Sequence, residues 1–281
     1  MRIQNLILAL PAKNSKIQSF EKKPYLRRSC FQPAQNYWET IDAALSLQDP
    51  TYEMLKVILG RRISPDQYME EYIDIGIRRR RIKREKLYKL VSAGASLVLN
   101  RIELVSPTMQ NICMEVGRLI GVQTTGNCYA TLGREPATDV HWDRHDVFVV
   151  QLSGRKHWRV YPPTFSLPLS NHESVAKKED VPPAAALDIV LEAGNAIYVP
   201  RGWWHRVVPV DGFDTIHLTV AVHVPVILDY LIWACSNVLP EHLEFRHGLV
   251  GQDRELELVD DALATLRQTL ERPEVFAQFR E

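Results

Sequence analysis

The chain has 281 residues, of which 46% are hydrophobic and 24% are charged, proportions that are typical of a globular protein. It contains 34 basic and 34 acidic residues, so its formal net charge is zero and no overall field favours nucleic acid or a membrane surface. No apolar run approaches the roughly 20 residues needed to span a bilayer. The length allows one well-filled core with additions.

The four cysteines are widely spaced and form no Cys-x-x-Cys pair: they are Cys30, Cys113, Cys128 and Cys235. Disulfide frameworks and structural zinc sites normally show closely spaced cysteines. The spacing therefore predicts reduced thiols in a cytoplasmic protein.

Three segments near the start of the chain carry apolar residues at helical spacing, and they are residues 36–47, 51–60 and 66–76. In the second segment, Met54, Val57 and Ile58 fall at i, i+3 and i+4. Pro65 suits the first turn of the third helix, with Ser64 as its N-cap. We therefore expect three helices before the next, strongly basic, stretch.

Residues 77–94 hold eight basic side chains within a few turns of an expected helix. A basic patch could meet a phosphate or an acidic peptide near the mouth of a barrel. A solvated helix face, balanced by acidic residues such as Glu70, Glu71 and Asp74, is the simpler interpretation, and we favour it. Further on, residues 91–107 contain an apolar run that predicts a buried strand, and Pro107 starts a helix that ends at Gly121.

The sequence around His141 and Asp143 carries the first chemical signal. Residues i and i+2 of a strand point to the same face, so this imidazole and this carboxylate converge while Trp142 points away. Taken alone, His-x-Asp is a weak signal, because two polar residues on a solvated strand are common. The segments that follow strengthen it, since residues 146–152 read as an apolar strand and Gly154 as a turn.

A third candidate ligand lies far downstream at His205. Residues 191–207 predict a strand, a glycine turn, a short strand ending at Pro200, and a further strand that begins at His205. This order suits a jelly-roll barrel, which brings a late strand back beside an early one. Two histidines and one carboxylate form a facial triad that leaves metal positions open, as non-haem Fe(II) requires.

These residues carry a family resemblance. The segments HWDRHDVFVVQLSGRKHWRVYPP (141–163), AGNAIYVPRGWWHRV (193–207) and IHLTV (216–220) resemble the JmjC-type cupins, and among them the ribosomal-oxygenase-like hydroxylases that use Fe(II), 2-oxoglutarate and O₂. The resemblance implies that His141, Asp143 and His205 bind the iron. It also implies that Lys156 and Tyr129 hold the distal carboxylate of 2-oxoglutarate.

Three further positions match the family near its co-substrate: they are Asn127, Thr215 and His217. Physical chemistry agrees with the role of Lys156, because a carboxylate buried in a narrow barrel is costly unless it is paired and hydrogen-bonded. Lys156 would supply the charge and the Tyr129 hydroxyl a neutral donor. The turn at Gly154 resets the pleat between His141 and Lys156, so strand parity does not decide whether they face each other.

Several neighbouring residues could be mistaken for site residues. His145 and Asp146 follow the His-x-Asp pair, but we expect His145 to be structural. His157 alternates with Lys156 and should face outward. Trp203 and Trp204 could form an aromatic wall for a substrate, although packing is the more frequent use of tryptophan.

After Val224 the composition changes to helical segments. Pro225 opens an apolar helix over residues 226–239. The last segment carries an a/d seam, formed by Leu256, Val259, Leu263, Leu266 and Leu270. Packing within the chain and pairing with a second chain explain this seam equally well. The related ribosomal oxygenases are dimers with a further winged-helix-like region, for which this chain is expected to be too short.

Together these features predict a mainly β protein with helical additions, a double-stranded β-helix of JmjC type. The expected parts are an N-terminal elaboration at residues 1–120, a barrel at 121–224 and a C-terminal helical region at 225–281 that could form a homodimer. The predicted activity is hydroxylation of an unactivated C–H bond, with a protein, a peptide or an amino-acid derivative as substrate. A small-molecule oxygenase, a non-oxidative metal-binding cupin and a non-catalytic scaffold are the alternatives. Neither membrane nor nucleic-acid partners are expected.

Overall fold

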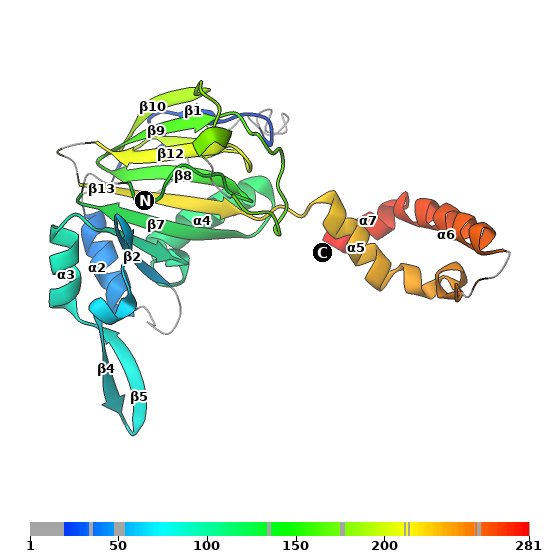
Figure 1. Ribbon diagram of the computed structural model, residues 1–281, viewed down its shortest axis with the longest axis horizontal. Helices are drawn as coiled ribbons and strands as arrows, with labels where there is room; N and C mark the ends of the chain where they lie inside the picture. The colour runs from blue at the N-terminus through cyan, green and yellow to red at the C-terminus, as the bar shows by residue number, and fades with distance from the viewer. Residues whose placement is uncertain are drawn as a thin grey trace. The chain divides into compact units, whose positions relative to one another are not determined.

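The computed structural model describes residues 20–33, 36–47, 54–133, 136–174, 178–210, 212, 214–249, 251 and 254–280. The chain divides into two compact units, Met1–His223 and Val224–Glu281. The first unit contains the sheets and the second contains helices (Figure 1). The expected mainly β composition with helical additions is confirmed.

Two antiparallel sheets form the body of the first unit. The larger sheet has the order β1 (Tyr25–Arg27), β11 (Ala196–Val199), β8 (Asp146–Ser153), β13 (Thr215–Val222), β7 (Thr124–Thr131), β6 (Ser96–Asn100), β2 (Leu55–Leu59) and β3 (Arg61–Arg62). The smaller sheet has the order β10 (Leu187–Glu192), β9 (Arg155–Tyr161) and β12 (Trp204–Pro209). Strands far apart in sequence therefore become neighbours, as a jelly roll requires.

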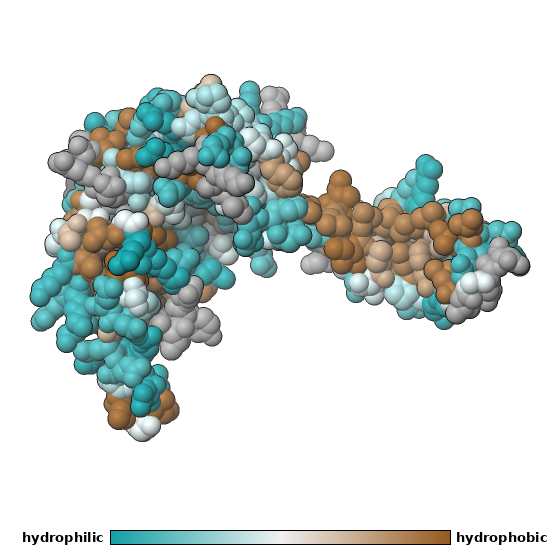
Figure 2. Space-filling view, viewed as in Figure 1, coloured by the Kyte–Doolittle hydropathy of each residue, from teal (hydrophilic) through white to brown (hydrophobic). Residues whose placement is uncertain are grey.

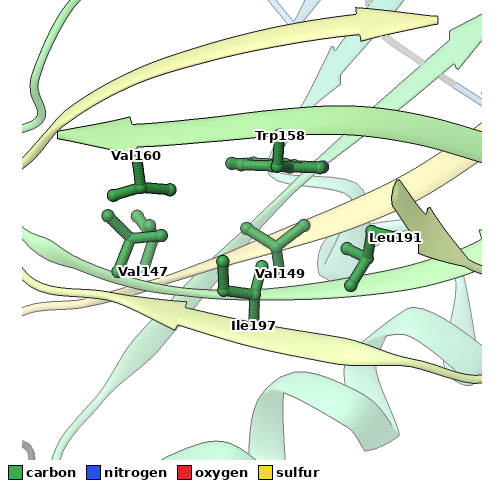
Figure 3. Packing of buried hydrophobic residues seen from close by; sticks show 7 residues of the cluster. Val147, Val149, Trp158, Val160, Leu191 and Ile197 are labelled. Carbon is green, nitrogen blue, oxygen red and sulfur yellow. The ribbon is translucent and has the colours of Figure 1, made fainter. Parts of the chain in front are cut away.

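The core lies between these two sheets (Figure 3). It is formed by Val147, Val149, Trp158, Val160, Leu191, Ile197 and Val199. Strand β9 alternates between buried and more exposed positions, so Lys156, Trp158 and Val160 all point inward. Strand β8 is buried at almost every position, which explains why it reads as a continuous apolar run.

Two of the three helices predicted near the start of the chain are wrong. Helix α2 (Tyr37–Leu47) is confirmed, but the segment around Val57 forms strand β2, paired with β6. The segment after Ser64 makes one 3-10 turn, η1 (Pro65–Gln67), and then strand β4 (Met69–Asp74). Over a short run, apolar residues spaced three or four apart are compatible with a helix or a strand, and pairing with neighbouring strands made these segments strands.

The basic stretch is also divided differently from the expectation. Its first half is strand β5 (Ile77–Ile82), which pairs with β4 as a hairpin, and its second half is helix α3 (Arg84–Ser92). Ile75 and Gly76 both have positive φ, which builds the tight turn. The predicted acidic balance is confirmed, because Arg78 pairs with Glu71, Arg79 with Asp74 and Arg81 with Glu70; these are the cross-strand ion pairs. The hairpin ends in an apolar tip (Figure 2) formed by Ile73, Ile75 and Ile77.

The predicted strand and helix before the barrel are confirmed as β6 and α4 (Pro107–Ile120). The Ser106 hydroxyl accepts a hydrogen bond from the backbone N–H of Met109, and Pro107 occupies the first turn. Gly121 ends the helix at φ 81°, a conformation that glycine adopts without strain.

The C-terminal unit contains α5 (Ile227–Asn237), α6 (Glu255–Leu270) and α7 (Pro273–Arg280). The Tyr230 hydroxyl donates to the Leu270 carbonyl at 3.1 Å, and its ring packs against Trp233, Phe276 and Phe279. The seam of α6 is only partly covered, with Leu256 81% and Leu263 55% exposed. Within the described part of the chain, no helix has the length and apolar character needed to cross a membrane.

Candidate metal and co-substrate site

Three side chains from two distant segments meet at one end of the core, and Asp143 lies in the loop before β8 rather than on the expected strand. His141 and His205 form an antiparallel β-bridge, in which each backbone N–H donates to the other residue's carbonyl, at 3.2 and 2.7 Å. Asp143 lies 3.8 Å from His141, Oδ1 to Nε2, and 3.7 Å from His205, Oδ2 to Nε2. The three ligand atoms lie within 4.8 Å of one another, a separation that suits a single metal ion.

Both imidazole rings are oriented for metal binding. The Nδ1 of His141 lies 2.7 Å from the Asp139 carbonyl, and the Nδ1 of His205 lies 3.2 Å from the Trp203 carbonyl. A carbonyl can only accept, so each Nδ1 donates to it, and Nε2 is the ring nitrogen left to face a metal ion. This arrangement is the usual support for a metal-binding histidine.

The protonation states at this end also suit a cation. Burial by itself raises the pKa of Asp143, but His205 and His141 outweigh it and hold that pKa below its ordinary value. Burial, together with His141, lowers the pKa of His205 to about 4. At neutral pH the group therefore presents a carboxylate and a neutral imidazole, the forms that bind metals.

Lys156 occupies the other end of the same cavity. It is 2% exposed, on the inward face of β9, and its Nζ lies 5.9 Å from the centre of the Tyr129 ring. Burial lowers the pKa of Lys156 to about 7. Tyr129 stacks on His217 with a centroid distance of 4.7 Å, and burial raises the pKa of its hydroxyl.

One cavity between the sheets is lined both by the three candidate metal ligands and by Lys156 and Tyr129. About 490 Å³ of space lies among these side chains, part of it open to solvent. The apolar wall includes Val147, Val149, Trp158 and Val207. Two buried nitrogens of lining residues, His217 Nδ1 and Trp158 Nε1, have no hydrogen-bond partner among the described residues. Buried polar atoms without partners are costly, so the cavity fits a polar ligand.

Comparison with known proteins agrees with this geometry. Residues 99–230 match the model of a family described as the JmjC domain. This region of the protein is therefore similar to a JmjC domain. Its matched region includes His141, Asp143, Lys156 and His205.

The chain is also similar to longer relatives. Ribosomal oxygenase 1 of Rattus norvegicus is 31% identical over 170 residues, which cover 58% of this chain and 28% of the relative. The bifunctional lysine-specific demethylase and histidyl-hydroxylase NO66 of Culex quinquefasciatus is 25% identical over 233 residues, which cover 76% of this chain and 36% of the relative. The chain thus spans about a third or less of the length of these two relatives.

Solved structures show the same fold. Escherichia coli YcfD superposes with a TM-score of 0.57 at 16% identity, covering 92% of this chain and 67% of that one. A structure of YcfD described as a ribosomal oxygenase, in complex with cobalt and 2-oxoglutarate, has a TM-score of 0.54 at 16% identity and covers 92% and 66%. The expected JmjC-type cupin barrel is confirmed.

Not every predicted site residue lines the cavity. His217 and Tyr129 do, but Asn127 and Thr215 are not among the lining residues. The Asn127 side chain accepts from the Arg101 backbone N–H at 3.4 Å. Thr215 accepts instead from the Gln151 amide at 2.7 Å.

Trp158 and Thr219 are among the lining residues that the sequence reasoning did not single out. Each lies two positions after a predicted site residue on the same strand, Lys156 and His217, so strand alternation could have identified both. The aromatic neighbours are mainly structural. Trp204 is buried and donates to the Thr164 hydroxyl at 2.9 Å.

The remaining histidines of this region lie outside the ligand group. His145 packs beside His223, with 5.3 Å between ring centres. His157 pairs with Asp188 on the other face of β9. Both placements agree with the roles expected for them.

Proposed function

We propose that the protein is a 2-oxoglutarate-dependent hydroxylase that acts on a C–H bond of an amino-acid side chain in a protein or peptide. One observation carries the proposal: the facial triad and a buried lysine line the same narrow cavity. A simple metal-binding cupin needs the triad, but it does not need a buried ammonium group at the far end of a slot.

The relatives support this reaction class. The names ribosomal oxygenase and histidyl-hydroxylase describe proteins that share the JmjC domain, and a YcfD structure contains cobalt and 2-oxoglutarate. The protein substrate is inferred from these names. Ribosomal protein as the substrate of this chain is a narrower inference, which the shared domain supports less directly.

The residues present fit the two implied ligands. His141, Asp143 and His205 would hold Fe(II), since a 2-His-1-carboxylate set with open positions suits this ion. Bound Fe(II) would supply O₂ activation, coupled to oxidation of 2-oxoglutarate to succinate and CO₂. Lys156 and Tyr129 would bind the distal carboxylate, the lysine by charge and the hydroxyl by donation.

The rest of the cavity would orient the co-substrate and exclude water. His217 stacks on Tyr129 and offers an unpaired Nδ1, so it would restrict the ring and complete the polar end. Asn127 and Thr215 remain predicted contacts, although each now accepts a hydrogen bond from another residue and neither lines the cavity. The apolar wall would keep water from the reacting centre, which strengthens every electrostatic contact inside.

The organisation of the whole chain is also a proposal. We assign the barrel to residues 121–224, its N-terminal elaboration to 1–120 and a helical region to 225–281. The exposed seam of α6 supports pairing with a second copy, because exposed apolar stripes of this kind usually mark an interface. A cytoplasmic location is supported by the widely spaced cysteines, all of which are free.

The test is succinate formation by the purified chain under air with Fe(II) and 2-oxoglutarate, followed by mass spectrometry for a gain of one oxygen in host peptides. Omission of either Fe(II) or 2-oxoglutarate should abolish both signals. Asp143→Ala should do the same, whereas Arg159→Gln, a change on the outer face of β9, should not. Metal binding without succinate under all conditions would favour a non-oxidative cupin or a scaffold and contradict the proposal.

A further inference from the structure

A chain of polar side chains links residues that are close in sequence to the candidate ligands. Arg201 Nη2 lies 2.6 Å from the Glu21 carboxylate. The Glu21 backbone N–H donates to the Tyr198 hydroxyl at 2.9 Å, and that hydroxyl donates to Asp146 at 2.5 Å. We call these four residues, Glu21, Asp146, Tyr198 and Arg201, the clamp.

The clamp joins the loop that carries Asp143 to the turn that precedes His205 on β12 (Trp204–Pro209). Asp146 follows Asp143 by three residues, and Arg201 precedes His205 by four. The backbone N–H and the charge of Arg201 both act on the Asp146 carboxylate, against the effect of burial, which raises its pKa. The same loop and turn are joined directly, since the Gly202 N–H donates to the Asp143 carbonyl at 2.9 Å.

Most of the clamp is buried. Asp146 and Tyr198 are each 2% exposed, and the Arg201 side chain is 10% exposed. Removing one member of a buried polar network leaves the others unsatisfied, so such networks hold their surroundings in one arrangement. Phe20 and Phe148 pack on the Tyr198 ring, with centroid distances of 5.8 and 4.9 Å, and restrict it further.

Glu21 brings a distant segment into this arrangement. It is 180 residues from Arg201 in sequence, and it adopts φ 58°, a left-handed conformation that is unfavourable for residues other than glycine. Strand β1, a few residues later, pairs with β11, and Tyr25 lies opposite Tyr198. The strained backbone is therefore maintained by contacts on both sides.

We propose that the clamp positions Asp143 and His205 for the metal, so that metal affinity depends on Glu21 and Tyr198 although neither contacts the ion. The inference rests on the proposed function only in taking the triad as a metal site. Groups that hydrogen-bond to metal ligands fix the orientation of these ligands, and their loss typically weakens metal binding by about 10–100-fold. The clamp acts one step further out, through residues next to the ligands in the chain, so we expect an effect at the lower end of this range. A clamp that served stability alone would leave the affinity of the folded protein unchanged.

The experiment is Co(II) titration of the full chain, followed by calorimetry and by the visible absorption of bound Co(II). Tyr198→Phe removes one oxygen that makes two hydrogen bonds, and it should weaken Co(II) binding by about 10-fold or more. Glu21→Gln keeps size but removes the charge facing Arg201, and it should weaken binding by a smaller factor. At saturating Co(II), the absorption bands of both variants should differ from those of the parent chain.

Arg159→Gln is the matched control, because it removes an ion pair to Asp188 of 3.1 Å that lies outside the clamp. It should leave Co(II) affinity within about twofold. Circular dichroism establishes that each variant is folded, and Glu21→Gln decides the matter if Tyr198→Phe does not fold, since Glu21 is only partly buried. If the clamp variants keep the Co(II) affinity and the spectra of the parent chain, the role of the clamp is refuted and the proposed metal site still stands. A parent chain that binds no Co(II) would overturn the proposed metal site as well.

Discussion

The buried lysine makes 2-oxoglutarate binding depend on pH in a predictable direction. Burial lowers the pKa of Lys156 from 10.5 to about 7 because the ammonium loses its hydration inside the cavity. Above pH 7 the empty site therefore holds mostly neutral lysine, and binding of a carboxylate must be accompanied by uptake of one proton. Below pH 7 the ammonium is already present.

The expected size follows from this pKa. The charged fraction falls about tenfold for each pH unit above 7, so affinity for 2-oxoglutarate should fall by about 1.4 kcal/mol per unit between pH 7 and 9. The assay is anaerobic calorimetry with Mn(II)-loaded protein in two buffers of different ionisation enthalpy, which reports the proton uptake. Affinity that stays constant from pH 6 to 9 without proton uptake would refute the role given to Lys156.

The same residue predicts an effect on stability. Folding lowers the pKa of this lysine, so charging it costs free energy in the folded state. This cost is complete at pH values below the folded-state pKa, and it disappears as the pH rises towards 10.5. The shift corresponds to about 5 kcal/mol at pH 6, as an upper bound. Lys156→Met should therefore raise the unfolding free energy of the ligand-free protein at pH 6 and much less at pH 10, while 2-oxoglutarate binding is lost. Equal effects at both pH values would contradict the buried, ligand-free ammonium.

Four further predictions concern other parts of the molecule. Asp143→Ala should weaken Co(II) binding by at least about 100-fold in a calorimetric titration, and retained affinity would exclude the triad as the metal site. Gly202→Ala should lower the unfolding free energy by about 1–3 kcal/mol in urea, because a Cβ would lie 2.6 Å from the Phe165 carbonyl oxygen at φ +82°; an unchanged midpoint would argue against this tight turn. Ile75→Asn should stabilise the hairpin by up to about 1 kcal/mol, since asparagine tolerates φ 49° better than a β-branched residue; a lower melting temperature would instead indicate that the isoleucine packs. Leu263→Asp should convert any dimer to monomer in light scattering, and an unchanged mass would remove α6 from the interface.

Local sequence patterns were sufficient to predict part of the fold. Helix α4 was predictable because Ser106, Pro107 and Gly121 each act through the backbone of their own neighbourhood. Strands β8 and β9 were predictable because an apolar run and a period-two alternation report how many faces are buried. By contrast, the segment around Val57 has a spacing compatible with a helix, and only pairing with β6 made it a strand.

The sequence by itself indicated the candidate ligands, because His-x-Asp shortly before an apolar strand and a histidine after a Pro-Arg-Gly turn are local signals. Tertiary structure decided which residues join them. It placed Lys156 in the cavity, although the turn at Gly154 left its face undetermined, and it left Asn127 and Thr215 outside the lining. It also brought Glu21 to Arg201. A local period reports only which face of an element is buried, whereas contacts between residues 180 positions apart depend on the order in which strands pair.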